Sequence, residues 1–220
     1  MKKAAYLFII ALVLIFVSPK SFSQEAAARK DFKFTIKTNP FSALGGPFWA
    51  IGIFPITGEY KLLGEYAFAK KMSFQLGASY IGPSALLNLN KLLSDSSEVT
   101  DIKTSGFKIT GMYKYFISRD LNAPEGFYVA PHFSFATAKL TAIPKVDTIR
   151  YSLKPQKINI NICLGYQMIT SGGFTLDIFT GIGYVSRKWN YEGKTKGQFD
   201  LGKDKSSISI PFGFYFGYAF

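Results

Sequence analysis

The feature that most constrains the fold of this 220-residue chain is a regular alternation of bulky residues with small or polar ones. In the segment 207–220, every second residue is large and apolar or aromatic, and most residues between them are serine, glycine or alanine. Successive side chains of a β-strand point to opposite faces, so a period of two predicts strands with one apolar face. Eight segments carry this pattern, at 31–39, 54–68, 72–81, 105–117, 126–136, 156–169, 174–185 and 206–220.

The connections between these segments are of two kinds. Residues 69–71 and 170–173 form very short links and residues 118–125 a modest one, whereas the other four connections are longer, up to 82–104. Short turns at one rim and long loops at the other are typical of outer-membrane barrels. We therefore predict an all-β fold, an eight-stranded antiparallel up-and-down transmembrane β-barrel.

The volume of the interior decides which face of the strands points outward. An eight-stranded barrel has a lumen barely wide enough for side chains, and the segment 206–220 alone carries four phenylalanines and a tyrosine on one parity. These side chains cannot all point inward, so we predict that the bulky face meets lipid and the small, polar face lines the lumen. A soluble ligand-carrying barrel would have the opposite arrangement.

The first 23 residues have the three parts of a secretory signal peptide. Lys2 and Lys3 form a basic start, Ala4 to Val17 are apolar, and the segment 21–23 places small residues where a signal peptidase reads. An uncleaved anchor helix is the alternative, but the apolar stretch is shorter than the ~20 residues of a bilayer span. We predict cleavage of residues 1–23, a barrel domain at 24–220, and location in a Gram-negative outer membrane with both termini periplasmic.

The end of the sequence predicts how the barrel is closed and assembled. Phe216, Tyr218 and Phe220 are the last outward residues, where an interfacial aromatic girdle belongs. This ending resembles the C-terminal signature of outer-membrane barrels, which implies recognition by the barrel-assembly machinery. Backbone groups in lipid need internal partners, so the first segment must pair with the last. Pro131 and Pro211 lack a donor for the ladder, and we expect a bulge or a strand end near both.

The order of local motifs is also informative. FTIKTNPF at 34–41 is followed by GEYKLLGEYAFAKKMSFQLGASYIG at 58–82, YKYFISRDLNAPEGFYVAPHFSF at 113–135 and FTLDIFTGIGYV at 174–185. Together these motifs resemble an uncharacterised family of small outer-membrane β-barrel proteins, catalogued as a domain of unknown function. The resemblance covers most of the predicted barrel and implies a fold and a location, but no activity and no catalytic residues.

The sequence offers little for metal, cofactor or nucleic-acid binding. His132 is the only histidine and Cys163 the only cysteine, which excludes a histidine-based metal cluster and an internal disulfide. The formal net charge of +12 is compatible with a solvated basic surface or with attraction to an anionic lipid or polysaccharide surface. We expect no metal, no cofactor and no nucleic-acid partner; the expected contacts are outer-membrane lipid and lipopolysaccharide.

One pair of residues raises an enzymatic alternative. His132 and Ser134 have the i, i+2 spacing that puts both side chains on one face of a strand, where an imidazole could deprotonate a hydroxyl. Outer-membrane lipid A deacylases resemble this arrangement, with a His-x-Ser pair on a strand of a small barrel. The pair shares its parity with Tyr128 and Ala130, however, and is predicted to face the lumen. A hydrogen-bonded luminal histidine is therefore the competing interpretation.

The other inward ionisable residues have a structural explanation. They are Glu59, Lys61, Glu65, Lys108, Lys114, His132, Lys157 and Asp177. Buried charges must be paired, so salt bridges are expected to fill the narrow interior and close it to ions. We expect no carboxylate pair. Glu59 and Glu65 share a face but stand six residues apart, roughly 20 Å along a strand, and Asp177 lies on a strand that is not a neighbour of theirs.

The longer loops are the predicted sites of partner binding. Residues 40–53 are unusually apolar, and residues 85–93 have helical apolar spacing within the loop 82–104. Either this helix packs over the barrel mouth or it contacts the membrane or a partner. We predict a non-enzymatic integral barrel that is structural or binds a protein partner through loops 40–53 and 82–104; the alternative is a lipid-modifying enzyme that uses His132 and Ser134.

Overall fold

The structure is a computed structural model that describes residues 31–50, 54–85, 99–144, 151–192 and 204–220. The predicted signal peptide and nearly all of the predicted helix at 85–93 lie outside these residues. Residues Phe32–Phe220 form one compact unit. No helix within the described ranges is long and apolar enough to cross a membrane.

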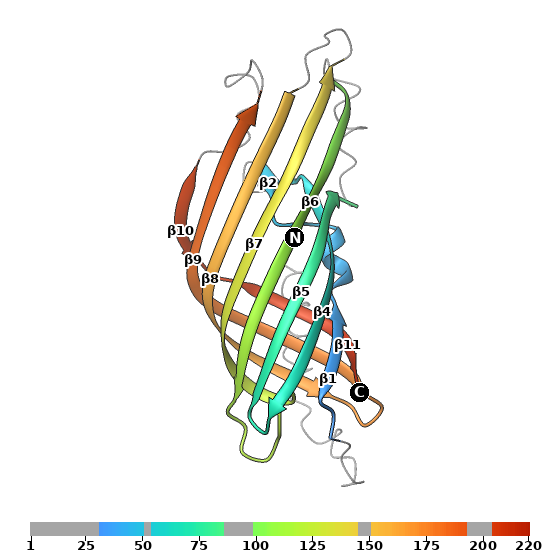
Figure 1. The fold of residues 1–220 in the computed structure, drawn as a ribbon, viewed down its shortest axis with the longest axis vertical. Coiled ribbons are helices and arrows are strands. Elements are labelled where there is room, and N and C mark those ends of the chain that lie inside the picture. Colours follow the sequence, from blue (N-terminus) through green and yellow to red (C-terminus); the bar gives the residue numbers. More distant parts are fainter. Residues whose placement is uncertain (1–30, 51–53, 86–98, 145–150, 193–203) are drawn as a thin grey trace, which may run out of the picture. The chain divides into compact units, whose positions relative to one another are not determined.

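The described part of the chain is almost entirely β-structure (Figure 1). Its long strands are β4 (Thr57–Ala69), β5 (Met72–Pro83), β6 (Val99–Phe116), β7 (Gly126–Pro144), β8 (Tyr151–Ile169) and β9 (Phe174–Glu192). The first strand, β1 (Phe34–Thr38), is short, and the last consists of two pieces, β10 (Lys205–Ser209) and β11 (Phe212–Ala219). A short 3-10 helix, η1 (Pro40–Ala43), and the two-residue strands β2 (Trp49–Ala50) and β3 (Phe54–Pro55) lie between β1 and β4.

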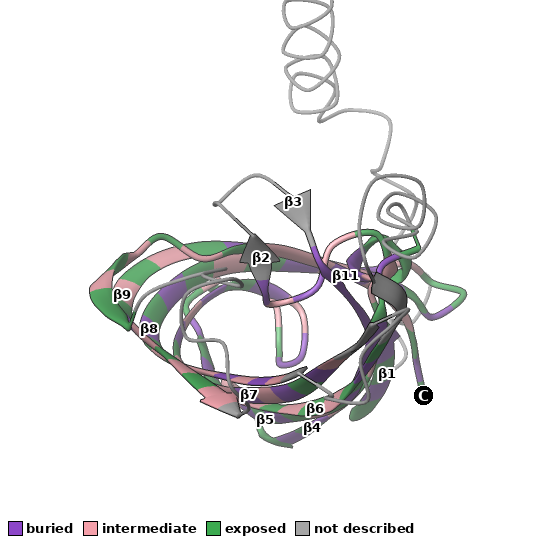
Figure 2. Ribbon diagram, turned by 90° about the horizontal axis from the view of Figure 1, so that it is seen from above, coloured by how far each residue is buried: buried purple, intermediate pink, exposed green. Residues whose placement is uncertain are grey.

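Neighbouring strands pair antiparallel, and the sheet closes on itself. β11 pairs with β9 on one side and with β1 on the other, where Thr35 lies opposite Ala219. β1 in turn pairs with β4, so the strands surround a lumen (Figure 2). The prediction of an eight-stranded antiparallel up-and-down barrel is confirmed, with β10 and β11 counted as one strand.

The two faces of the barrel differ as the alternation predicts. Buried and exposed residues alternate along the strands (Figure 2). Leu62, Leu76 and Ile182 are among the many large apolar residues exposed on the outer face. The opposite parity carries buried polar and small residues, and two clusters of buried hydrophobic side chains lie among them. The outer surface is therefore apolar and the interior largely polar.

Several strands are longer at their loop ends than the sequence indicates. β6 begins at Val99 rather than at residue 105, β7 runs to Pro144 rather than to 136, and β9 ends at Glu192 rather than at 185. β8 extends in the same direction, and its residue Ser152 lies opposite Glu192. In most of these extensions the polarity of the two faces is inverted: Lys139 and Lys188 are exposed on the outward parity, whereas Leu140 and Leu153 are buried on the inward one. The pattern of bulky outward residues that marks the strands therefore does not reach them. Part of the predicted loop 82–104 is consequently strand.

The two prolines behave differently. The interruption between β10 and β11 falls at Ile210 and Pro211, as expected, and the pairing with β9 keeps one register across it. The expectation of a bulge or a strand end at Pro131 is wrong. Pro131 lies opposite Ile162 in an unbroken β7–β8 ladder, and the β6–β7 ladder resumes in the same register beyond it. The barrel tolerates the missing N–H donor of Pro131 because the residue pairs before and after it keep the same register with both neighbouring strands.

β1 is much shorter than the strands beside it. It pairs only with Leu63–Tyr66 of β4 and with Phe216–Ala219 of β11. Within the described ranges, no strand therefore pairs with residues 57–62 of β4 on the side that faces β1. The same holds for residues 205–215, from the start of β10 into β11, on their side that faces β1. We call the interval between these two edges the notch. η1 follows directly after β1, and Pro40 stands in its first turn, where proline cannot extend the ladder.

Candidate functional site

The lumen contains a group of four charged side chains, Lys37, Glu65, Lys114 and Asp177, which we call the central cluster. The Nζ atoms of Lys37 and Lys114 lie 2.7 Å and 2.6 Å from Oδ2 of Asp177. Lys114 also lies 3.3 Å from Oε2 of Glu65, and Lys37 forms an ion pair with the same carboxylate. All four side chains are fully buried, and their formal charges cancel.

Neutral polar groups complete the hydrogen bonding of the central cluster. Both lysines donate to Oε1 of Gln167, each at 2.8 Å, and Lys37 donates to Gln75 at the same distance. The hydroxyl of Tyr128 donates to Oδ1 of Asp177 at 2.6 Å, and its ring lies 4.4 Å from the Lys114 ammonium. A buried ion pair is tolerated when its remaining donors and acceptors are satisfied in this way. The central cluster is thus a bonded network that spans the lumen.

The composition of the central cluster corrects one expectation and adds one residue. The expectation that Asp177 would stay apart from Glu65 is wrong, because in a narrow barrel side chains from non-adjacent strands meet across the lumen. Lys37 is missing from the predicted inward set. Lys37 alternates with the outward residues Phe34 and Ile36, and this alternation is the sequence signal that would have placed Lys37 in the inward set.

A second group of charges lies nearer the loop end, on β4, β6, β8 and β9. It comprises Glu59, Lys61, Lys108, Lys157 and Arg187, and we call it the basic cluster. Lys61 and Lys108 lie 3.2 Å and 3.1 Å from Oε1 of Glu59, which also accepts a hydrogen bond from Ser79 at 2.8 Å. Lys157 and Arg187 are opposite each other on β8 and β9, with the inward parity. The basic cluster thus combines four cationic side chains with one carboxylate.

A cavity of about 330 Å³ lies at the basic cluster, and its lining includes residues from both edges of the notch. Its polar lining includes Glu59, Lys61, Lys108 and Lys157, and its apolar lining includes Phe41, Phe212 and Phe214. Lys157 donates to the carbonyl oxygen of Pro47 at 3.3 Å. Positive charge and an apolar rim are features that suit an amphipathic anion.

His132 and Ser134 both face the interior, but they bond to different partners. The ring nitrogens of His132 lie 2.9 Å from Oγ1 of Thr110 and 3.1 Å from Nδ2 of Asn161. Ser134 is buried and accepts a hydrogen bond from Asn159 at 2.9 Å. With both ring nitrogens engaged, this geometry matches a hydrogen-bonded luminal histidine rather than a base poised at Ser134.

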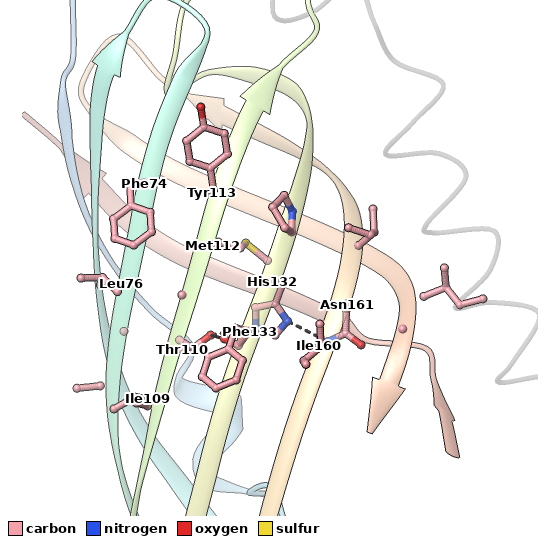
Figure 3. Close-up of a pocket in the computed structure, with 17 residues that line it drawn as sticks. Phe74, Leu76, Ile109, Thr110, Met112, Tyr113, His132, Phe133, Ile160 and Asn161 are labelled. Carbon is pink, nitrogen blue, oxygen red and sulfur yellow. Dashed lines mark hydrogen bonds between the residues drawn. The ribbon is translucent and has the colours of Figure 1, made fainter. Parts of the chain in front are cut away.

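A larger depression of about 950 Å³ is formed by β5 to β9 (Figure 3). Its lining is dominated by Phe74, Leu76, Ile109, Phe133 and Ile160, with His132 and its two hydrogen bonds also visible in Figure 3. Ser134 is not among the lining residues. A surface of this composition suits an apolar chain and offers no charged group to a polar substrate.

The loop after β1 turns into the barrel rather than away from it. Phe48 is buried in a cluster with Ile56 and Leu140, and its ring lies 6.3 Å from that of Trp189. The hydroxyl of Thr57 donates to the carbonyl oxygen of Phe48 at 3.4 Å. Within loop 40–53, the apolar surface of Phe48 is therefore used for packing and is not available to a partner.

Comparisons with known proteins provide no identification. No family model matches the chain, and neither a curated protein nor a solved structure is significantly similar to it. The described residues also contain no group of three or more side chains suited to hold a metal ion. The function must therefore be inferred from the barrel and its interior.

Proposed function

We propose that this protein is an integral outer-membrane β-barrel, closed to ions and without enzymatic activity, which is structural or binds a partner through its loops. The observation that carries the proposal is the inverted distribution of polarity, with an apolar outer wall around a polar, charged lumen. A continuous exposed apolar surface is unfavourable in water, whereas it is the surface a barrel needs in lipid.

The interior supports a closed barrel rather than a pore. The central cluster joins β1, β4, β6 and β9 across the lumen through direct ion pairs. An ion crossing the barrel would have to break these bonds and leave buried charges unpaired, at a cost of several kcal/mol. An eight-stranded barrel is also too narrow for an aqueous channel of the porin type.

The arrangement of the ends supports the proposed orientation. Phe220 lies at the same end of the barrel as the short turns 69–71 and 170–173 (Figure 1). In outer-membrane barrels this end is periplasmic and the longer loops are extracellular. Export would depend on the predicted signal peptide at 1–23, and the described loop ends are the surfaces left for a protein partner.

The lipid-modifying enzyme is the weaker candidate. It requires His132 to act as a base on Ser134, but the hydrogen bonds of His132 lead to Thr110 and Asn161 instead. A deacylase would also need the serine on a surface that lipid can reach, and Ser134 is buried.

Cell fractionation tests the location. The protein, with a tag in the turn 118–125, should appear in the outer-membrane fraction and should migrate faster on SDS gels before boiling than after. Recovery in the soluble periplasm would overturn the proposal. Recovery in the outer membrane with altered lipid A acylation that depends on His132 and Ser134 would instead support the enzymatic alternative.

A further inference from the structure

The notch is an interval of the barrel wall that has no strand ladder across it. On the β4 side, two side-chain hydrogen bonds stand in for the missing strand partner. Thr38 Oγ1, at the end of β1, donates to the carbonyl oxygen of Lys61 at 2.7 Å, and Ser42 Oγ in η1 donates to that of Glu59 at 2.6 Å. On the other side the loop packs through the ring of Phe41, 5.6 Å from that of Phe214. Side-chain packing thus replaces a backbone ladder across this interval.

The cavity behind the notch carries excess positive charge. The central cluster has two lysines and two carboxylates, whereas the basic cluster has three lysines and an arginine with Glu59 as its one carboxylate among the described residues. Within the same residues, no carboxylate lies at ion-pair distance from Lys157. An anion that entered this cavity would offset the excess positive charge of these residues.

The rim of the notch indicates what kind of anion would enter. Ile208, Ile210 and Phe212 are 75%, 77% and 71% exposed; Leu62 and Ile182, at 62%, come next among the large apolar side chains that the structure describes. Their greater exposure follows from the missing strand on their β1 side. An apolar surface of this kind continues directly from Phe212 into the lining of the charged cavity.

We propose that the notch binds one anionic membrane lipid, with its phosphate-bearing head group at Lys108 and Lys157 and its acyl chains along Ile210 and Phe212. A free phosphate would satisfy only the lysines, whereas a lipid satisfies both the charge and the exposed apolar rim. Access is from the side of the barrel, between β4 and β11. The inference rests on the proposed function, since the lipid can reach the notch only if the barrel lies in a membrane.

Native mass spectrometry of the barrel extracted from membranes in detergent tests the proposal. The probes are dimyristoyl phosphatidic acid, dimyristoyl phosphatidylcholine and inorganic phosphate, each added to the same protein. We expect one phosphatidic acid molecule to be retained, and the other two probes to be retained at least tenfold less. Lys157→Gln should weaken retention of phosphatidic acid about tenfold, as expected for the loss of one charge-assisted hydrogen bond.

Lys139→Gln is the matched control, because Lys139 is exposed on β7 and its replacement removes the same charge outside the cavity. It should retain the lipid as the unmodified protein does. Equal retention by the Lys157 and Lys139 variants, equal retention of phosphatidylcholine, or binding of inorganic phosphate alone would each overturn the lipid site. These outcomes leave a folded, membrane-recovered barrel intact, so they are distinct from a failure of the proposed function, which fractionation detects.

Discussion

Lys37 and Asp177 are 140 positions apart in the sequence, yet Nζ of Lys37 lies 2.7 Å from Oδ2 of Asp177 inside the barrel. The pair joins β1 to β9, two strands that are not hydrogen-bonded to each other, because β11 lies between them. β1 has five residues, as does the β10 piece, and every other strand of the barrel is longer. Few backbone hydrogen bonds therefore hold β1 in place. The central cluster therefore anchors the strand that closes the barrel.

Asp177→Asn should strongly destabilise the barrel. The change leaves Lys37 and Lys114 with Glu65 as their one remaining carboxylate, and removing one partner from a buried ion pair costs about 3–5 kcal/mol. Urea unfolding of the protein in lipid vesicles, followed by tryptophan fluorescence, measures the loss. The added change Lys37→Met should recover part of it, because one lysine and one carboxylate then remain paired.

Asp120→Asn serves as the control for this prediction, since Asp120 is exposed in the turn 118–125 and outside the central cluster. Equal midpoints for the Asp120 and Asp177 variants would contradict an anchoring role for the central cluster.

The intact barrel should not conduct ions. In planar bilayers, insertion of the purified protein should give no stepwise current, because the bonded side chains of the central cluster occupy the lumen. Regular conductance steps at low protein concentration, absent from mock preparations, would mean that an aqueous path bypasses the cluster.

His132→Ala should affect stability but not lipid chemistry. The change removes one hydrogen-bonding partner from each of Thr110 and Asn161 and should cost about 1–3 kcal/mol in the free energy of unfolding. Ser134→Ala, which removes one hydrogen bond with Asn159, should cost about 1 kcal/mol. Mass spectrometry of lipid A from cells that express either variant should match that from cells with the unmodified protein; a change in acylation specific to both variants would favour the enzymatic alternative.

Gly217 is required for closure at the seam between β11 and β1. A Cβ atom at this position would overlap the carbonyl oxygen of Ile36 and crowd Cγ of Lys37. Backbone cannot move aside as a flexible side chain can, so Gly217→Ala should reduce the folded fraction on unboiled SDS gels severalfold. Gly172→Ala is the matched control, because a Cβ there has no atom within 4 Å. Comparable folded fractions for the two variants would show that the seam has more room than the structure gives it.

The sequence was sufficient for the fold but not for the two charged clusters. A period of two over eight segments determines strand number and the inward face, and that face includes Glu59, Glu65, Lys114 and Asp177. Their division into a neutral and a basic cluster depends on strand register, which hydropathy does not encode. The notch likewise arises from the length of β1 relative to its neighbours, a property that appears only when the strands are aligned.

Phe220 is the outermost residue of the aromatic stripe that includes Phe216 and Tyr218. Its backbone is part of the closing seam: the amide of Phe220 donates to the carbonyl oxygen of Phe34 at 2.8 Å, and the amide of Lys33 donates to that of Phe220 at 3.0 Å. Its ring lies 5.1 Å from that of Tyr218. Phe220→Asp keeps the backbone bonds and removes the aromatic group that we expect the assembly machinery to recognise.

Phe127→Asp is a matched control. Phe127 and Phe220 are both 58% exposed. Phe127 is the second residue of β7 and so lies next to the turn 118–125, at the end of the barrel where the chain also ends. A charge near the membrane interface costs about 1 kcal/mol or less at either position, too little to unfold an assembled barrel.

Phe220→Asp should therefore slow insertion in cells, with protease-sensitive protein accumulating in the periplasm, while Phe127→Asp inserts at nearly the normal rate. The fraction of Phe220→Asp that does insert should resist SDS at room temperature as the unmodified protein does. Pulse-labelling with protease treatment measures both insertion rates. Equal rates for the two variants would contradict a role of the C-terminal aromatic stripe in assembly and would leave it as an ordinary lipid-facing strand.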